Sequence, residues 1–194
     1  MSGFDSTGYR ADVLSWNFSC MEIYLIRHTK PAIDTGICYG QSDIDVADSF
    51  EEEAAIIKKR LPSALHIYSS PLKRCYRLAS YLYPQSIIEQ HDHLKEMHFG
   101  EWELQPWDQV PADPLNGWMQ DFVNVRVPGG ENYIDLYNRT ISFYDHIISK
   151  DQPAAIFTHS GNIRSILSYV NNVPLSESFS KFKIGYGEVV RITR

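Results

Sequence analysis

Short apolar, strand-like runs alternate with longer helix-like stretches along this chain, and the alternation constrains its fold more than any other feature. It predicts an α/β domain, a three-layer sandwich whose mostly parallel central sheet carries helices on both faces. Residues 98–130, which contain four prolines, are expected to be irregular. Strands are expected at residues 22–26, 65–69, 87–89, 154–158 and 188–193, and helices at residues 49–60, 71–83, 132–149 and 162–170.

The length of the chain fits one domain with a complete core, since 43% of its 194 residues are hydrophobic. The globular pattern begins at Met21, and residues 21–194 are expected to form a single domain. Residues 1–20 lack the basic start, apolar core and cleavage site of a signal peptide. We expect them to form a non-core N-terminal extension, and an extra strand or helix packed on the domain is the alternative.

The charge balance argues against nucleic acid as a partner. The net charge is −6 and the sequence has no basic stripe, whereas binding to DNA or RNA needs clustered positive charge. A locally positive pocket in an acidic protein instead suits a small anionic substrate. The basic residues that lie near the candidate site segments are Arg27, Lys73, Arg74 and Arg77.

Cysteine content and hydropathy bear on location. The three cysteines, Cys20, Cys38 and Cys75, show no CxxC spacing, which predicts reduced thiols and a cytoplasmic protein. No apolar stretch approaches the roughly 20 residues that span a membrane, so no membrane partner is expected. The sequence leaves open whether the protein is a monomer or a homodimer.

Two of the expected strands stop at a histidine, which is His28 in one case and His159 in the other. Because the carboxyl ends of parallel strands form the ligand crevice, both imidazoles and the guanidinium of Arg27 are expected in one place. A neutral imidazole can attack phosphorus and give a phosphohistidine that water later cleaves. The backbone amides after His159, at the start of a helix, suit an anion. Either histidine alone is most simply a hydrogen-bonded residue at a strand end.

Two further segments supply an arginine and a carboxyl group. Residues 69–74 read Ser-Ser-Pro-Leu-Lys-Arg and place Arg74 in the first turn of a helix, where its planar guanidinium can bind two phosphate oxygens. A nearby carboxyl group could protonate the leaving oxygen of a phosphate ester. Glu96, Glu101 and Glu103 are the candidates, and composition alone does not choose among them.

Together and in this order, these segments resemble the histidine phosphatase (phosphoglycerate mutase-like) superfamily. The shared motifs are Arg-His after the first strand, Ser-Ser-Pro-Leu-x-Arg, a Glu before Phe-Gly-x-Trp, and a late His-x-Gly. The resemblance covers residues 21–194 and implies the phosphoglycerate mutase-like fold, without a metal or cofactor. It implies His28 as nucleophile and Glu96 as proton donor. The residues implied to hold the phosphate are Arg27, Arg74 and His159.

Within the superfamily the chain is most similar to the alpha-ribazole phosphatases of cobalamin nucleotide-loop assembly. The similarity rests on residues 27–31, 36–43 and 128–132, where Asn132 replaces a Ser. It implies hydrolysis of alpha-ribazole 5′-phosphate or adenosylcobalamin 5′-phosphate. The alternative is a histidine phosphatase or phosphoglycerate mutase-type enzyme for another small phosphate ester. A non-catalytic phosphate-binding module is a third interpretation, which the presence of every expected chemical group disfavours.

Departures from the superfamily pattern concern substrate binding. Arg-His-Gly is Arg-His-Thr here, and the usual Thr-x-x-Asn is not recognisable. Tyr39 or Gln41 is expected to replace that Asn, and Ser160 is a further candidate for substrate binding. The last expected strand lies a few residues from the end of the sequence, which leaves no tail to act as a lid and favours hydrolysis over phosphoryl return.

The aromatic residues of the stretch 98–130 are candidates for a pocket that stacks on a flat base such as dimethylbenzimidazole. The alternative is that these rings pack the stretch onto the core. Trp102 and Trp118 are the substrate-binding candidates in this stretch, and Trp107 and Phe122 accompany them.

Overall fold

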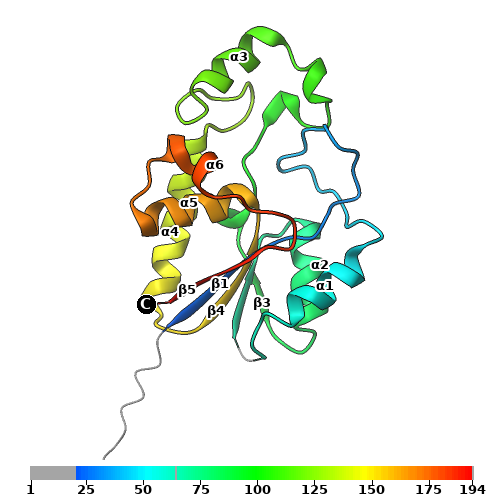
Figure 1. Cartoon of the computed structure of the whole chain (residues 1–194), viewed down its shortest axis with the longest axis vertical. Coiled ribbons are helices and arrows are strands. Elements are labelled where there is room, and N and C mark those ends of the chain that lie inside the picture. Colours follow the sequence, from blue (N-terminus) through cyan, green and yellow to red (C-terminus); the bar gives the residue numbers. More distant parts are fainter. Residues whose placement is uncertain (1–20, 64, 194) are drawn as a thin grey trace, which may run out of the picture.

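A computed structural model describes residues 21–63 and 65–193, so the expected N-terminal extension lies outside the described residues. A central sheet has the strand order β3-β2-β4-β1-β5 (Figure 1). β5 runs antiparallel to β1, whereas the other pairs are parallel, which confirms the expected mostly parallel α/β sheet. That residues 21–194 form a single domain stays a prediction. The strands are β1 (Glu22–Arg27), β2 (His66–Ser69), β3 (Ile88–Gln90), β4 (Ala154–Thr158) and β5 (Val189–Thr193).

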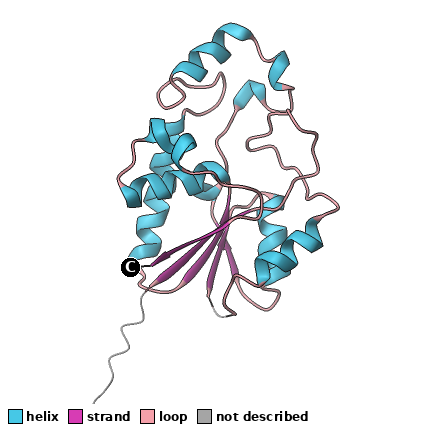
Figure 2. Cartoon of the chain, viewed as in Figure 1, coloured by secondary structure: helices cyan, strands magenta, loops and turns pink. Residues whose placement is uncertain are grey.

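The side chains of β1 show why both faces of the sheet are covered. Ile23 and Leu25 belong to one core cluster and Tyr24 and Ile26 to another, because successive side chains of a strand point to opposite faces. Helices cover both faces, which gives the three layers seen in Figures 1 and 2. The pairs are α4 (Tyr133–Ser149) with α5 (Ser160–Asn171), and α1 (Phe50–Lys58) with α2 (Lys73–Leu82).

Most of the expected elements are confirmed, with ends that differ by a few residues. α2 begins at Lys73 rather than at residue 71, because Leu72 is still extended. α5 begins at Ser160 rather than at residue 162, which makes His159 its N-cap. α4 begins after Asn132, whose side chain and that of Asp135 form a reciprocal capping box that contributes about 1 kcal/mol.

Residues 98–130 are not irregular throughout, so that prediction is wrong for part of the stretch. They contain α3 (Ala112–Gln120) and the short 3-10 helices η2 (Gly100–Trp102) and η3 (Trp107–Gln109). Pro114 lies in the first turn of α3, where its missing N–H leaves no helix bond unmade. Three side chains of the stretch, Trp102, Val110 and Val127, are buried in a third core cluster that also contains Cys38.

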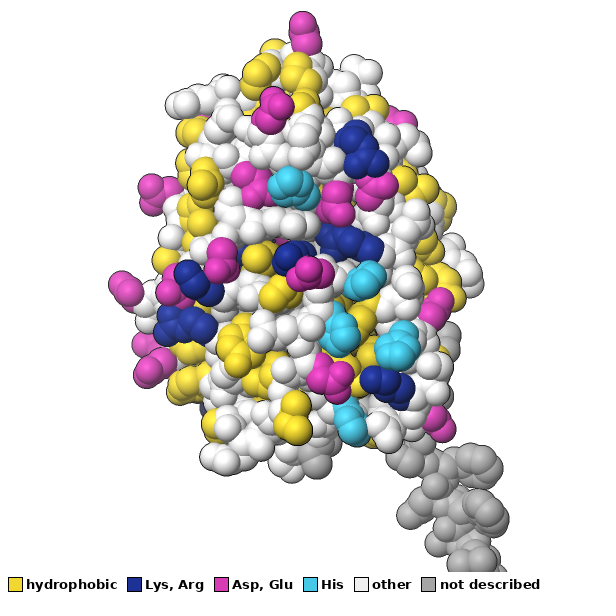
Figure 3. All heavy atoms as spheres, turned by 180° about the vertical axis from the view of Figure 1, so that it is seen from behind, with side chains coloured by type: hydrophobic (Ala, Val, Ile, Leu, Met, Phe, Trp, Pro, Cys, Tyr) yellow, Lys and Arg dark blue, Asp and Glu magenta, His cyan; other side chains and the backbone are white. Residues whose placement is uncertain are grey.

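Three short elements were not expected from the sequence: η1 (Asp92–Leu94), η4 (Leu175–Glu177) and α6 (Ser178–Lys181). Among the described residues, no helix has the length and apolar character needed to cross a membrane. On the face shown in Figure 3, basic and acidic side chains are interspersed, and the described residues form no basic stripe there.

Candidate active site

The register of the sheet brings three site segments to one edge. β1 pairs with β4 so that Arg27 lies opposite Thr158, and β2 pairs with β4 so that Ser69 lies opposite Phe157. The residues that follow these three aligned strand ends therefore emerge together. They are His28, Ser70 and His159.

His28 is only 2% exposed, and its ring centroid lies 5.1 Å from that of His159. Its Nδ1 lies 2.7 Å from the backbone carbonyl oxygen of Thr29. Because a carbonyl oxygen can only accept, Nδ1 carries the proton and Nε2 keeps its lone pair. Burial, and then the charges of Arg74 and Arg27, lower the pKa of His28 well below its ordinary value. The ring is therefore neutral at neutral pH and has a nucleophilic nitrogen.

His159 is fully buried beside the start of α2. Its Nε2 lies 2.9 Å from the hydroxyl oxygen of Ser70 and 3.5 Å from the sulfur of Cys75. Burial, followed by the charge of Arg74, also lowers the pKa of His159 well below its ordinary value. Burial raises the pKa of the Cys75 thiol to about 12, so this group stays protonated and donates to the carbonyl oxygen of Thr158.

Arg27 and Arg74 are both held by backbone carbonyl groups. Nη1 of Arg27 donates to Ile184 at 2.7 Å, and the two terminal nitrogens of Arg74 donate to Ser42 at 2.8 Å and Gly40 at 2.6 Å. The Nε atom of each arginine is buried without a hydrogen-bond partner. Buried charged donors are costly to leave unpaired, so these two N–H groups suit an anionic ligand.

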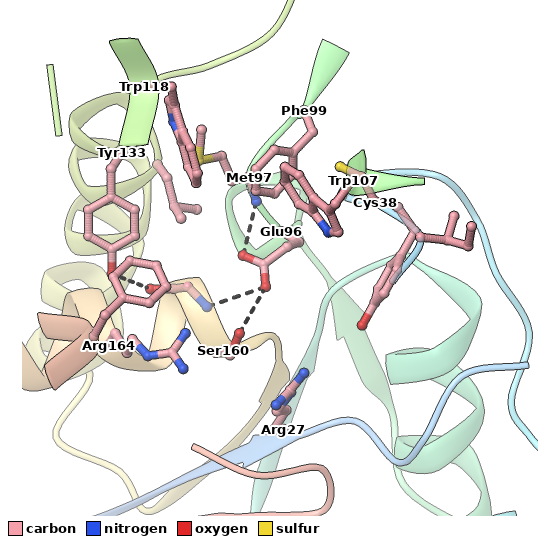
Figure 4. A pocket seen from close by; sticks show the side chains of 16 residues that line it. Arg27, Cys38, Glu96, Met97, Phe99, Trp107, Trp118, Tyr133, Ser160 and Arg164 are labelled. Atoms are coloured by element: carbon pink, nitrogen blue, oxygen red, sulfur yellow. Dashed lines mark hydrogen bonds between the residues drawn. The ribbon is translucent and has the colours of Figure 1, made fainter. Parts of the chain in front are cut away.

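Glu96 lies next to the start of α5 (Figure 4). Its Oε1 accepts from the N–H of Met97 at 3.0 Å, and its Oε2 accepts from the N–H of Gly161 at 3.3 Å and the hydroxyl of Ser160 at 3.4 Å. A Cβ atom on Gly161 would collide with Oε1 of Glu96 and with Leu136. The close approach of the carboxylate to α5 therefore requires glycine at this position.

The structure separates the three candidate carboxylates. The carboxylate of Glu103 accepts hydrogen bonds from the backbone N–H groups of Gln41, Ser42 and Phe99, so it holds two loops together. Glu101 is exposed on η2. Of the three, Glu96 is the one that lines the pocket, together with Arg27 and Ser160, which are the sequence neighbours of the two histidines.

Gln41 and Tyr39, the two expected replacements for the missing Asn, make different contacts. Nε2 of Gln41 donates to the carbonyl oxygen of Glu96 at 3.0 Å, so this side chain supports the backbone of Glu96. The ring of Tyr39 lies 5.2 Å from the guanidinium carbon of Arg74, and its hydroxyl lies 3.0 Å from that of Tyr186. Tyr186 belongs to none of the four motifs, and no sequence signal pointed to it.

A pocket of about 170 Å³ opens beside Arg27, Glu96 and Ser160 (Figure 4). Arg164, which sequence reasoning also missed, lines it with a guanidinium that lies 4.5 Å from the ring of Phe179 and whose Nε donates to the backbone. Six aromatic side chains line the pocket. They are Tyr39, Phe99, Trp107, Trp118, Tyr133 and Phe179.

Two of the tryptophans in this region line the pocket, and a third is buried in the core. Trp118 and Trp107 line the pocket, and their ring planes differ by 19° with centroids 6.2 Å apart. Trp102 is only 2% exposed and does not line the pocket, because η2 turns its ring into the core beneath Trp118. Phe122 packs against Trp118 from behind, with centroids 6.3 Å apart.

The part of the chain that the structure describes contains no group of three or more His, Cys, Asp or Glu side chains arranged to hold a metal ion.

Comparison with protein families decides what kind of protein this is. A profile of the histidine phosphatase superfamily (branch 1) matches residues 23–194. The chain belongs to this superfamily. The match spans both strand-end histidines of this histidine phosphatase and implies phosphatase activity. Among curated protein sequences, no match to the chain was found.

Solved structures share the fold of this histidine phosphatase at low sequence identity. The alpha-ribazole phosphatase of Shigella flexneri is 20% identical with a TM-score of 0.80, and the match covers 88% of this chain and 89% of that one. A mycobacterial glucosyl-3-phosphoglycerate phosphatase is 18% identical with a TM-score of 0.76 and 89% of both chains covered. A protein of Thermus thermophilus is 26% identical with a TM-score of 0.70, covering 89% of this chain and 93% of that one. These likenesses confirm the phosphoglycerate mutase-like fold and leave the substrate open.

Proposed function

We propose that this protein hydrolyses a phosphate monoester through a phosphohistidine at His28. The proposed substrate is alpha-ribazole 5′-phosphate, or adenosylcobalamin 5′-phosphate, in cobalamin nucleotide-loop assembly. The observation that carries the proposal is the aromatic pocket that opens beside Arg27, Glu96 and Ser160, of which Arg27 and Ser160 adjoin the neutral histidines His28 and His159 in the sequence.

In the first step, Nε2 of His28 attacks phosphorus, and an N–P bond forms as the ester P–O bond breaks. Glu96 in its protonated form gives its proton to the leaving oxygen. The three non-bridging oxygens are held by N–H donors, and the positive charges of Arg27 and Arg74 offset theirs. The neutral ring of His159 supplies a further N–H donor.

In the second step, a water molecule attacks the phosphorus of the phosphohistidine. The Glu96 carboxylate takes a proton from this water, and the N–P bond breaks to return neutral His28 and inorganic phosphate. The same carboxyl group thus serves as acid and then as base, which its position beside the pocket and the phosphate site permits.

The wall of the pocket supports the proposed leaving group. Dimethylbenzimidazole is flat and apolar, and it suits a wall that contains the nearly parallel rings of Trp107 and Trp118. The guanidinium of Arg164 can donate to oxygens of the ribose. A glucosyl glycerate would bring a carboxylate and many hydroxyls against these rings, which is costly unless each group finds a partner.

The experiment that tests the proposal measures release of inorganic phosphate without added metal. Alpha-ribazole 5′-phosphate is compared with 3-phosphoglycerate, phosphoserine and p-nitrophenyl phosphate. We expect kcat/KM for the ribazole ester to exceed that for the other two biological esters by at least about 100-fold. His28→Ala should lower turnover by at least about 10⁴-fold, whereas the exposed His146→Ala should not.

The outcomes separate mechanism from substrate. Turnover of p-nitrophenyl phosphate alone, lost in His28→Ala, would keep the histidine mechanism and remove the cobalamin assignment. Preference for 3-phosphoglycerate or phosphoserine would favour another small phosphate ester. Activity that survives in His28→Ala would overturn the mechanism.

A further inference from the structure

One short segment between α6 and β5 holds the guanidinium of Arg27 from two sides. The ring centroid of Tyr186 lies 3.9 Å from the guanidinium carbon, so the ring covers one face of the cation. The carbonyl oxygen of Ile184 accepts a hydrogen bond from Nη1 of Arg27 at 2.7 Å and so fixes one edge of the guanidinium. The Nε–H of the same guanidinium, buried without a partner, is left for a ligand.

The same segment is tied to the strand that carries the nucleophile. The N–H of Gly187 donates to the carbonyl oxygen of His28 at 3.1 Å, and the N–H of Arg27 donates to that of Glu188 at 2.9 Å. Gly187 has a φ of +66°, a conformation that favours glycine. This turn places the ring of Tyr186 5.7 Å from that of His28.

Tyr39 has a matching place over the second arginine. Its ring lies 5.2 Å from the guanidinium carbon of Arg74, and its hydroxyl lies 3.0 Å from that of Tyr186. Burial, and then the neighbouring hydroxyl, raise the pKa of Tyr39, so its hydroxyl stays protonated and can share this hydrogen bond. Tyr39 and Tyr186 thus link two loops that are far apart in the sequence. The ring of Tyr39 lies over Arg74, and the ring of Tyr186 lies over Arg27.

We infer that Tyr186 is a positioning residue, whose ring holds Arg27 in the orientation that binds a phosphoryl oxygen and whose hydroxyl links this support to Tyr39. The ring of Tyr186 is itself 43% exposed, whereas the Nε atom of the guanidinium that it covers is buried, so the ring shields one face of a partly buried cation. The effect on turnover rests on the proposed function, whereas the effect on phosphate binding does not.

The test compares Tyr186→Leu with Tyr186→Phe and uses the exposed Tyr169→Leu as a matched control. Binding of inorganic phosphate is measured by calorimetry, and kcat/KM is measured with p-nitrophenyl phosphate. We expect Tyr186→Leu to weaken phosphate binding and lower kcat/KM by about tenfold, and Tyr186→Phe to stay within about twofold of the natural protein.

The pH dependence of kcat/KM distinguishes positioning from a general structural role. The groups that face His28 are Arg27, Arg74, His159, Tyr186 and the carbonyl of Thr29. The charge of Arg27 helps to keep the pKa of His28 low, so releasing this guanidinium raises that pKa. The acidic limb of the profile should therefore move to higher pH in Tyr186→Leu and stay in place in Tyr169→Leu.

Unchanged phosphate affinity and an unchanged pH profile in Tyr186→Leu would overturn the inference. A Tyr186→Phe variant as weak as Tyr186→Leu would assign the effect to the hydroxyl and also remove the role of the ring. Tyr186→Met, which keeps bulk without the ring, makes the comparison if the leucine variant does not fold. His28→Ala, assayed in parallel, tests the proposed function separately, because phosphate titration needs no turnover.

Discussion

The proposed phosphate site and the pocket beside it are built in different ways. The phosphate site takes its groups from the ends of β1, β2 and β4, where strand register places His28 beside His159. The pocket takes its aromatic wall from η3, α3, α4, α6 and the loops that carry Tyr39 and Phe99, all of which lie outside the sheet. In this molecule, therefore, the sheet positions the proposed chemistry, and segments outside the sheet shape the space for the proposed leaving group.

Replacing Glu96 tests the residue at which the two regions meet. Glu96→Gln keeps the size of the side chain and removes the proton, so kcat for alkyl phosphates should fall by about 10³-fold. Turnover of p-nitrophenyl phosphate should fall far less, because its leaving group needs no proton. Equal losses for both esters, measured by phosphate release, would remove Glu96 from the acid role.

Gly161→Ala changes the contact between Glu96 and the first turn of α5. The added methyl group would collide with the Glu96 carboxylate and displace it, and we expect alkyl ester turnover to fall by about 100-fold. Gly117→Ala on α3 is the matched control, since its methyl group would have nothing within 4 Å. If both variants kept full activity, the close contact between Glu96 and α5 would have no catalytic importance.

Trp118→Ala alters the pocket and leaves the phosphate site in place. Loss of this ring should raise KM for alpha-ribazole 5′-phosphate by about tenfold, by removing a stacking partner. The ratio of kcat/KM for the ribazole ester to that for phosphoserine should fall accordingly. A parallel fall for both esters would show that the two regions are not separable.

The pH dependence of the free energy of unfolding should show the smallest effect. It measures how much burial of the two neutral histidines lowers the stability of the folded chain at acidic pH. The pKa values of His28 and His159 lie well below the ordinary 6.5 in the folded chain, so only the unfolded chain takes up these protons as pH falls below about 6.5. Stability should therefore decrease by up to about 1.4 kcal/mol per pH unit for each histidine. Urea midpoints at pH 7.5 and 5.5 check this, and the slope should be shallower in His28→Gln.

The sheet-borne part of the molecule could be predicted from the sequence. The apolar runs of β1 and β4 predict buried strands. Because the two strands are parallel, the residues that follow them lie at the same edge of the sheet. His28 and His159 could therefore be placed together without knowledge of any loop. Arg74 could be placed because it opens a helix directly after a strand.

The pocket could be predicted only in part, because its geometry depends on tertiary packing. The prolines and glycines in residues 98–130 argue against a helix, so α3 was not predicted. It forms because Leu115 and Trp118 pack on the third core cluster. Local pattern selected Trp102 rather than Trp107 as a pocket residue, whereas the structure buries Trp102 on η2 and places Trp107 in the pocket wall. Tyr186 and Arg27 come from opposite ends of the described chain, and no motif joins them.

The construction of α3 has a consequence for evolution and for protein engineering. None of its nine residues is fully buried, and the segment joins the body of the molecule near the buried Val110 and Val127. A different helix grafted between these two anchors would leave the core strands and the proposed catalytic groups unchanged. It would need apolar side chains in place of Leu115 and Trp118, which pack on the third core cluster. New ester specificities should therefore be accessible by exchange of this one segment.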